Sequence, residues 1–278
     1  MKRWLITGIG SGLGAALAQA VLARGDRVAG TARNRTALAE FEALAPDRAF
    51  GFELDLRNDT NIAEVGKAAE AALGDIDVLL NNAGYGLVCA IEEASAAEVL
   101  DQFQVNVFGQ LAMIRAVLPF MRARRAGHIV NVTSVSGLAT WAGTGIYCAS
   151  KFAFEAIGQC LVQEVAELGI KVTNVEPGGM RTDYAGRSLV LSQNTIADYD
   201  GTARQAKHIL ADHAGKESGD PVRVAEAILK MVDSENPPLH LLLGADALHY
   251  AERQFDSIRA DIEKWKPVTL STAFPENS

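Results

Sequence analysis

Cysteine is scarce in this sequence of 278 residues, which has only Cys89, Cys148 and Cys160, far apart along the chain. An odd number of scattered cysteines, without the short spacings of metal ligands, argues against a disulfide framework. The five histidines are equally dispersed, so we expect no metal site. Reduced thiols are typical of a cytoplasmic protein, and we expect that localisation.

An excess of positive charge and long apolar runs are also missing. The formal net charge is −8, whereas a general nucleic-acid binder needs Lys and Arg to neutralise phosphates. No uninterrupted apolar stretch approaches the roughly 18 residues that suggest a membrane span. The apolar run in the opening MKRWLITG is too short for a secretory signal. We therefore expect a small-molecule substrate, with no nucleic acid and no membrane as a partner.

Short apolar runs alternate with longer helical patterns along most of the chain. The runs RWLITG, RVAGTA, AFGFELDL, DVLLNNAG, HIVNVTS, KVTNVEPG and LHLLLG predict seven strands. Helical patterns rich in Ala, Leu and Glu cover Gly12–Arg24, Thr36–Leu44, Thr60–Leu73, Ala96–Arg124, Tyr147–Leu168 and Pro221–Val232. This alternation predicts an α/β fold of the doubly wound Rossmann type. We expect one seven-stranded parallel sheet with helices on both faces, in a single domain over 1–278.

Two segments depart from this alternation. Residues 182–220 are irregular and polar with scattered large apolar side chains, which favours a substrate loop or lid. Residues 245–278 follow the last strand, and their pattern predicts a helix over 245–265 and then a tail.

The glycines of TGIGSGLG follow the first predicted strand and open the first predicted helix. Leu13 stands where the dinucleotide fingerprint G-x-G-x-x-G has its third glycine. Gly8 would permit a sharp turn, while Gly12 and Gly14 would let backbone N–H groups approach a pyrophosphate at the helix N-terminus. The alternative is a glycine-rich turn that binds no ligand.

The stretch YCASK places Tyr147 and Lys151 four residues apart, hence on one face of a helix. A tyrosine with its ordinary pKa of about 10 is a poor base at neutral pH, and a neighbouring ammonium favours its phenolate form. Ser134 ends the preceding strand and could donate a hydrogen bond to a substrate oxygen. The alternative is a helix surface pair without catalytic chemistry.

Taken together, TGxxxGxG at Thr7–Gly14, NNAG at Asn81–Gly84 and YxxxK at Tyr147–Lys151 resemble the short-chain dehydrogenase/reductase family. The region after the fifth strand and the long C-terminus look most like its 17-beta-hydroxysteroid dehydrogenase-like subgroup. The resemblance implies that the glycine turn holds the dinucleotide phosphates through Thr7, Gly8, Gly10, Ser11, Gly12, Leu13 and Gly14.

The resemblance also implies the other site residues. Asp55 and Leu56 would contact adenine, and Asn82, Ala83 and Gly84 would line the adenosine ribose. Pro177, Gly178 and Thr182 would contact the nicotinamide carboxamide. Asn106, Ser134, Tyr147 and Lys151 would form the catalytic set, in which Lys151 also holds the nicotinamide ribose and Asn106 holds a water for proton relay. Without the resemblance, Asn106 would pass for an ordinary helix asparagine.

The segment RVAGTARNR bears on the choice of cofactor. NAD-binding turns place an acidic residue at the end of the second strand, where it bonds the ribose 2′-OH. No carboxylate lies between Arg27 and Leu38, and Arg33 follows the strand directly. A guanidinium can meet a 2′-phosphate with paired donors, so we expect NADP(H) to be preferred, with NAD(H) possible and Ser11 as a further phosphate contact. The alternative is that Arg33 is a solvated loop residue.

The sequence thus favours an NAD(P)(H)-dependent oxidoreductase that interconverts a secondary alcohol and a ketone, with Tyr147 as general acid and base. A catalytically silent NADP(H)-sensing regulator of the same fold would not need the four catalytic residues. An epimerase or dehydratase would show a different glycine spacing. Trp141 and the apolar residues of 182–220 indicate a medium-sized, partly apolar carbonyl compound. The resemblance also implies a homodimer or homotetramer formed through the Tyr147–Leu168 helix.

Overall fold

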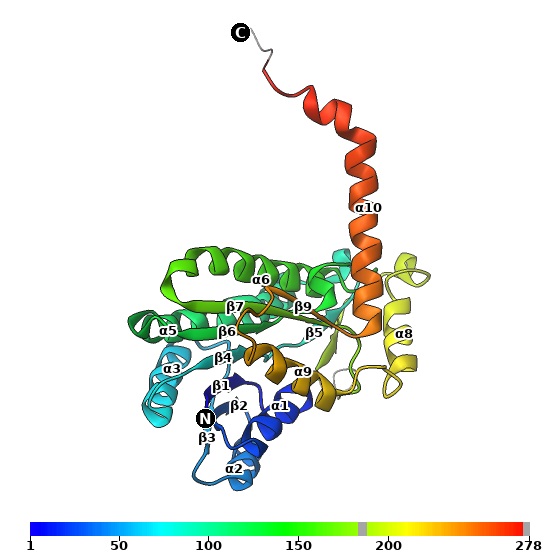
Figure 1. Ribbon diagram of the computed structural model, residues 1–278. Helices are drawn as coiled ribbons and strands as arrows, with labels where there is room; N and C mark the ends of the chain where they lie inside the picture. Colours follow the sequence, from blue (N-terminus) through cyan, green and yellow to red (C-terminus); the bar gives the residue numbers. More distant parts are fainter. Residues whose placement is uncertain (183–187, 275–278) are drawn as a thin grey trace.

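A seven-stranded sheet forms the centre of the computed structural model, which describes residues 1–182 and 188–274 (Figure 1). The strand order is β3-β2-β1-β4-β6-β7-β9, and every neighbouring pair is parallel. The strands are β1 (Arg3–Thr7), β2 (Arg27–Ala32), β3 (Ala49–Glu53), β4 (Val78–Asn81), β6 (Gly127–Val132), β7 (Ile170–Pro177) and β9 (His240–Leu243). The predicted parallel, doubly wound sheet is confirmed.

Helices cover both faces of this sheet because its central strands are apolar on both sides. They are α1 (Gly12–Ala23), α2 (Arg35–Leu44), α3 (Asp59–Leu73), α4 (Ala96–Phe103), α5 (Gly109–Arg124), α6 (Gly145–Glu164), α8 (Gln205–His213), α9 (Pro221–Val232) and α10 (Ala245–Leu270). One core contains side chains of α1, α2 and α9, and the other contains side chains of α3, α5 and α6. The two cores share the strands between them, so the sheet is buried on both faces.

The helical segment Ala96–Arg124 is continuous but not uniform. A π-helical turn over Gln104–Phe108 joins α4 to α5. By length and mean hydropathy (1.2) this segment reaches the range of a membrane-crossing helix, which the sequence analysis did not expect. Met113, Val117 and Met121 are fully buried in the core against α3 and the sheet. The segment therefore packs as a core helix within the described chain.

The region 182–220 contains more structure than predicted, and its residues 183–187 lie outside the described part. β8 (Leu189–Leu191) pairs in parallel with β5 (Gly86–Val88), and α8 follows. Buried Glu93 accepts hydrogen bonds from the backbone N–H of Ile196 (2.7 Å) and from Arg204 (2.8 Å). The described part of this segment is therefore less irregular than expected, because a carboxylate distant in sequence anchors it, and its role as a substrate loop or lid stays a prediction.

One further expectation is corrected near the C-terminus. The helix α10 continues through Pro267 to Leu270, whereas a tail was expected from Lys266 onward. A proline this close to a helix end interrupts little hydrogen bonding. On α6, the small residues Ala149, Ala156 and Cys160 are exposed on its outer side.

Candidate active site

The predicted site residues gather at the carboxyl ends of β1, β4 and β6. The strand order reverses between β1 and β4, where the chain runs outward from the centre in both directions. Ligands of open α/β sheets bind in the crevice at such a point. The topology thus brings together residues that are more than 100 positions apart in the sequence.

The glycine turn between β1 and α1 is packed so closely that two of its glycines admit no side chain. Gly8 has a φ of +76°, and a Cβ there would lie 2.9 Å from the Cβ of Ala83. A Cβ at Gly14 would lie 2.2 Å from the carbonyl oxygen of Gly8. Gly10 is different, because the nearest atom to its Cβ position is 3.5 Å away. Gly8 and Gly14 therefore shape the turn itself, and Gly10 leaves open surface beside it.

The N-terminus of α1 is built to receive an anion. Ser11 is its N-cap, yet its side chain caps no backbone N–H, and the first turn carries no acidic residue. Gly12 has a φ of +57°, and a Cβ there would lie 3.5 Å from the Cβ of Thr182. Thr182 therefore lies directly beside the glycine turn. Open N–H groups at a helix N-terminus favour phosphate, so this turn fits a dinucleotide. Leu13 is 5% exposed in the core, so only its backbone can face a ligand.

Thr7 and Asn82 tie the glycine turn to the end of β4. The Thr7 hydroxyl accepts hydrogen bonds from the backbone N–H of Asn82 (2.9 Å) and of Ala83 (3.0 Å). The Asn82 side chain donates to the carbonyls of Thr7 (2.9 Å) and Gly8 (3.2 Å). Both residues were predicted as cofactor contacts, and the structure gives them a role in holding the turn.

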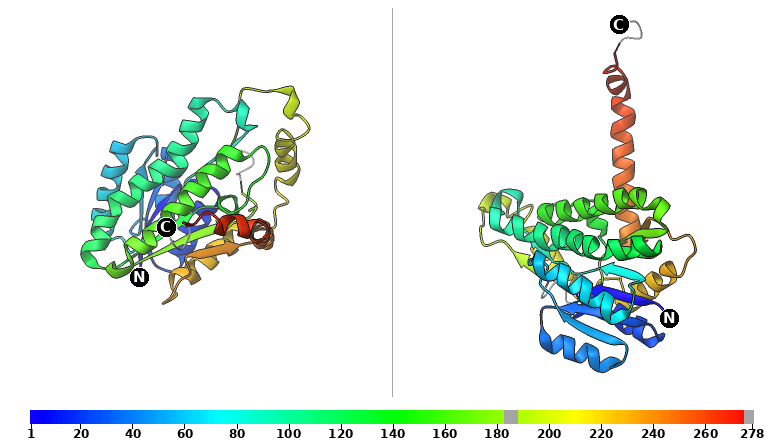
Figure 2. Two further views of the ribbon diagram at one scale, coloured as in Figure 1. Left: turned by 90° about the horizontal axis from the view of Figure 1, so that it is seen from above. Right: turned by 90° about the vertical axis from the view of Figure 1, so that its left-hand side faces the viewer.

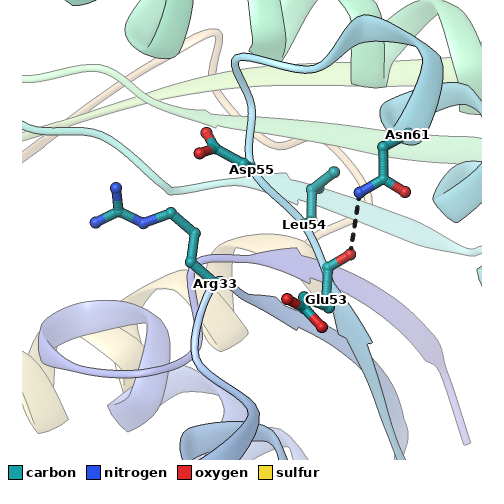
Figure 3. Close-up of a pocket in the computed structure, with 5 residues that line it drawn as sticks. All are labelled: Arg33, Glu53, Leu54, Asp55 and Asn61. Carbon is teal, nitrogen blue, oxygen red and sulfur yellow. Dashed lines mark hydrogen bonds between the residues drawn. The ribbon is translucent and has the colours of Figure 1, made fainter.

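A hollow of about 390 Å³ lies at the ends of β2 and β3, lined by Arg33, Glu53, Leu54, Asp55 and Asn61 (Figure 3). The Arg33 and Asp55 side chains extend to the same side of it. Asp55 pairs with Arg57 (3.2 Å), and Glu53 pairs with Arg35 (2.7 Å). Among the described residues no ion pair involves Arg33, so its guanidinium is available to a ligand. The side chain of Leu56 is 5% exposed in the core, so Leu56 can meet adenine only through its backbone.

Lys151 is the buried charge of the site. Its ammonium donates to the carbonyl of Val132 at the end of β6 (3.0 Å) and lies 5.9 Å from the ring centre of Tyr147. A Cβ at Gly84 would lie 3.7 Å from the same ammonium, so the NNAG turn passes directly beside it. Burial lowers the pKa of Lys151 to about 8, and the charge of Glu155 opposes that shift.

Asn106 lies in the π-helical turn and is almost completely buried. Its carbonyl oxygen accepts from the backbone N–H of Tyr85 (3.1 Å), and its amide donates to the carbonyl of Tyr85 (2.9 Å) and to Ser150 (3.2 Å). Ser150 in turn donates to the carbonyl of Tyr147 (2.7 Å). Asn106 therefore fixes the start of the helix that carries Tyr147, and the expected water relay stays a prediction.

Ser134 and the segment after β7 complete the site. The Ser134 hydroxyl accepts from the backbone N–H of Ser136 (3.0 Å), which leaves its proton for another acceptor. Pro177 ends β7, and the N–H of Gly178 donates to the carbonyl of Leu243 (2.9 Å). A Cβ at Gly178 would lie 2.3 Å from Asp246. This close contact fixes the backbone that leads to Thr182.

Comparison with known proteins decides the family. Residues 2–189 match the short chain dehydrogenase family. The chain belongs to the short-chain dehydrogenase/reductase family. It is 36% identical to oxidoreductase BOA17 of Botryotinia fuckeliana (98% of this chain and 99% of that protein covered). It is 34% identical to human retinol dehydrogenase 8 (84% and 79% covered).

Solved structures agree with this assignment. A short-chain dehydrogenase from Streptomyces avermitilis superposes with a TM-score of 0.91 at 39% identity, covering 98% of each chain. A short-chain dehydrogenase/reductase from Burkholderia phymatum in complex with NAD has a TM-score of 0.83 at 25% identity, covering 94% and 95%. The chain is thus an oxidoreductase of this family, with its nucleotide-binding Rossmann fold.

Sequence reasoning missed a row of buried amides that crosses this short-chain dehydrogenase beneath α6. Asn81, Asn131 and Asn174 occupy one register across β4, β6 and β7. Asn81 donates to Asn131 (3.1 Å), Asn131 donates to Asn174 (3.1 Å), and Asn174 donates to Glu155. Polar residues inside otherwise apolar strands were the available signal, and only the parallel register shows that they meet.

The row ends in a cluster of Glu155, Glu176 and His240. The His240 Nδ1 lies 2.7 Å from Glu176 and 3.2 Å from Glu155, and both carboxyl groups are buried. Burial raises the pKa of Glu176 to about 7, and the charge of Glu155 adds to that effect. A histidine with two carboxylates is a set that divalent metals use. Here His240 bridges both carboxyl groups, and the expected absence of a metal stays a prediction.

Proposed function

We propose that this protein uses NADP(H) to interconvert a secondary alcohol and a ketone, with Tyr147 transferring the proton. The observation that carries the proposal is the position of the Lys151 ammonium. It is buried between the NNAG turn, the end of β6 that leads to Ser134, and the Tyr147 ring. Burial of a cation costs stability, and a cation beside a tyrosine favours the phenolate form of that tyrosine. A buried lysine in this position of the crevice therefore indicates a functional role.

The protein's own part in this reaction is to hold charge and move a proton. The bound nicotinamide supplies or takes up the hydride. In the reductive direction the Tyr147 hydroxyl donates its proton to the carbonyl oxygen, and Lys151 stabilises the phenolate that remains. Ser134 donates a hydrogen bond to the same oxygen as negative charge develops there. Oxidation runs these steps backward.

We infer that the substrate is a partly apolar carbonyl compound of medium size. Trp141 and Tyr250 meet edge to face at 5.1 Å between ring centres, close to the loop that precedes Tyr147. The human relative is named for retinol, an apolar alcohol. The direct test is to incubate the purified protein with NADPH and a panel of steroid, acyl and aromatic ketones and to follow nicotinamide absorbance. Turnover on apolar ketones supports the proposal, and inactivity across the panel in both directions contradicts it.

Arg33 supports the preference for NADP(H). It follows β2 directly and lines the hollow where the adenosine end of the cofactor would lie. The carboxylates in that hollow are paired with other arginines, so they compete little with a 2′-phosphate. A guanidinium can bind that phosphate with two parallel hydrogen bonds.

Replacement of Arg33 with Ala is expected to weaken NADPH binding about tenfold to a hundredfold and to leave NADH binding nearly unchanged, since only the 2′-phosphate loses a partner. Arg223→Ala is the control, because Arg223 is an exposed arginine on α9 that does not line the hollow. Fluorescence titration of both cofactors measures the effect. Tighter binding of NADH than of NADPH by the unmodified protein, or equal losses in the two variants, would argue against this assignment.

We also infer that the outer face of α6 contacts a second copy of the chain. An apolar hollow of about 330 Å³ lies between α5 and α6, and it includes Ile157, Cys160 and Leu161. Apolar surface of this kind is typical of protein contacts. Light scattering on Ala156→Glu tests this inference, because a buried carboxylate in the contact would lower the assembled mass.

A further inference from the structure

The C-terminal helix α10 leaves the body of the molecule. It spans Ala245–Leu270, about 39 Å at 1.5 Å per residue. Its first turns rest on the body, where Ala247 and Ala251 are fully buried. Figure 1 shows the remainder rising away from the body, and the right-hand view of Figure 2 shows no other described element alongside its outer half.

An apolar seam runs along α10 and continues beyond the body. Its members alternate in steps of three and four residues: Leu248, Ala251, Phe255, Ile258, Ile262, Trp265 and Thr269. This is the a and d spacing of a coiled coil. Beyond the body the large seam side chains are 46–59% exposed. A helix of about 16 unsupported residues is marginal in water, so the outer half of α10 needs a partner that covers the seam.

The charges of α10 favour a protein over a membrane as that partner. Between residues 252 and 266 the helix carries four acidic and four basic side chains: Glu252, Asp256, Asp261 and Glu263, and Arg253, Arg259, Lys264 and Lys266. Helices that lie on anionic membranes are rich in Lys and Arg on their polar face. A narrow seam with balanced charge on both sides fits another helix instead.

We propose that the seam pairs with α10 of a second copy of this chain, in antiparallel orientation. The seam is self-complementary about position 260. When two copies run in opposite directions, Phe255 meets Trp265 of the second copy and Ile258 meets Ile262 of the second copy. Each pair then occurs twice about a two-fold axis, as an isologous dimer contact requires.

The position of the body determines the orientation. Ala247 and Ala251 show that the body lies on the seam side of α10 at its base. In a parallel pair, the bases of the two helices would lie side by side along the seam. Each body would then occupy the place of the first turns of the other helix. In the antiparallel pair, Leu270 of the second copy reaches the level of Tyr250, where the body begins. Leu270 is also the last residue of α10, so the second helix ends before it would meet the body.

Charges that flank the seam agree with the antiparallel register. In that register Glu252 lies within one helical turn of Lys266 of the second copy, at both ends of the contact. In a parallel register, Lys266 would lie opposite Asp261 instead. Near the two-fold axis of the antiparallel pair, Asp261 lies beside Asp261 of the second copy, and the two carboxylates repel each other. Removal of the charge of Asp261 should therefore strengthen the antiparallel pair, whereas it would weaken a parallel pair by removing the partner of Lys266.

The oligomeric state of the full-length protein tests the seam. Ile262→Glu places a charge in the seam, and Ala260→Glu places the same charge on the opposite side of the helix as a control. Sedimentation and light scattering should show the unmodified protein and Ala260→Glu at one mass and Ile262→Glu at half of it. Circular dichroism and melting of the body check that each variant is folded. An unmodified protein that is monomeric, or an Ile262→Glu variant of unchanged mass, overturns the proposal.

Charge exchange tests the register. Glu252→Lys should weaken association, and the double variant Glu252→Lys, Lys266→Glu should restore it. Asp261→Asn should strengthen association, because it removes the repulsion at the axis. Failure of the double exchange, or weaker association of Asp261→Asn, would overturn the antiparallel register.

Flotation with phosphatidylserine vesicles tests whether the seam binds a membrane surface instead of a second copy. The proposal predicts that the protein does not float with them. Vesicle binding that Ile262→Glu abolishes, in a protein that is monomeric without vesicles, would assign the seam to a membrane surface and contradict the proposal.

Discussion

Lys151 shows how one residue of the site depends on its surroundings. Its ammonium is buried, which lowers its pKa to about 8, and Glu155 lies one helical turn further along α6. The charge of Glu155 opposes the effect of burial. In the proposed reaction Lys151 must stay charged, yet it loses its proton only a little above neutral pH. Glu155 then acts as a positioning residue for that charge.

Replacement of Glu155 with Gln is expected to move the alkaline limb of kcat/KM to lower pH, by about one unit. The charged form of Lys151 is present below its pKa of about 8 and is lost as the pH rises through that value. Removing the negative neighbour lowers that pKa further. Glu164→Gln, an exposed position on the same helix, is the control. A limb that stays in place in the Glu155→Gln variant would show that Glu155 does not support the charge of Lys151.

The motif residues of the site could be predicted from sequence because their spacing within one segment carries the information. Tyr147 and Lys151 lie on one helical face by periodicity alone. Glu155 and Asn174 could not be found in this way, because their contact depends on how α6 packs on β7. Sequence spacing describes neighbours within an element, while contacts between elements require the register and the packing.

The glycine turn is the element that sets the entrance to the cofactor crevice. A Cβ at Gly14 would meet the carbonyl oxygen of Gly8, and a Cβ at Gly8 would meet Ala83, so neither position admits a side chain without displacing its neighbours. Thr7 and Asn82 hold the same turn from the side of β4. Contacts within the protein therefore hold the turn in its shape.

Gly14→Ala is expected to destabilise the protein by about 1–3 kcal/mol, the usual cost of overpacking, because its Cβ would lie 2.2 Å from the carbonyl oxygen of Gly8. Gly10→Ala, with 3.5 Å to its nearest neighbour, should be nearly neutral for the protein without ligand. Urea unfolding of the two variants measures the difference. Equal stability of the two would mean that the turn is not as tightly packed as described.

Elements with strong periodicity were predictable, and those held by distant contacts were not. The strands and α1, α3 and α9 match their predicted ranges closely. β8 has only three residues and no periodic pattern, and it forms because it pairs with β5 about 100 positions earlier. The end of α10 was predicted too early, at Trp265, whereas the helix continues to Leu270 with Pro267 in its last turn.

At the scale of the whole molecule, the sheet connects two cores that differ in what they position. The core of α1, α2 and α9 supports the glycine turn and the hollow at Arg33. The core of α3, α5 and α6 supports Asn106 and Lys151. A dinucleotide in the crevice would touch residues from both halves, so its binding should stabilise the fold as a unit.

Saturating NADPH is therefore expected to raise the melting temperature of the protein in a single cooperative transition. A ligand that binds only the folded state stabilises it by about 2.7 kcal/mol at a hundred times its Kd. NADH at the same concentration should give a smaller increase, because it makes no use of Arg33. Differential scanning calorimetry without and with each cofactor measures this, and a melting curve that neither cofactor shifts would rule out the crevice as their site.

The central claim is that Tyr147 transfers a proton while the rest of the site binds and orients. Its most direct test is the turnover of Tyr147→Phe on a ketone that the unmodified protein reduces, measured together with the Kd for NADPH. The phenyl ring keeps the packing and loses only the hydroxyl, so we expect turnover to fall by at least about a hundredfold while the Kd for NADPH stays within about twofold. A Tyr147→Phe protein that retains near-normal turnover would contradict the account.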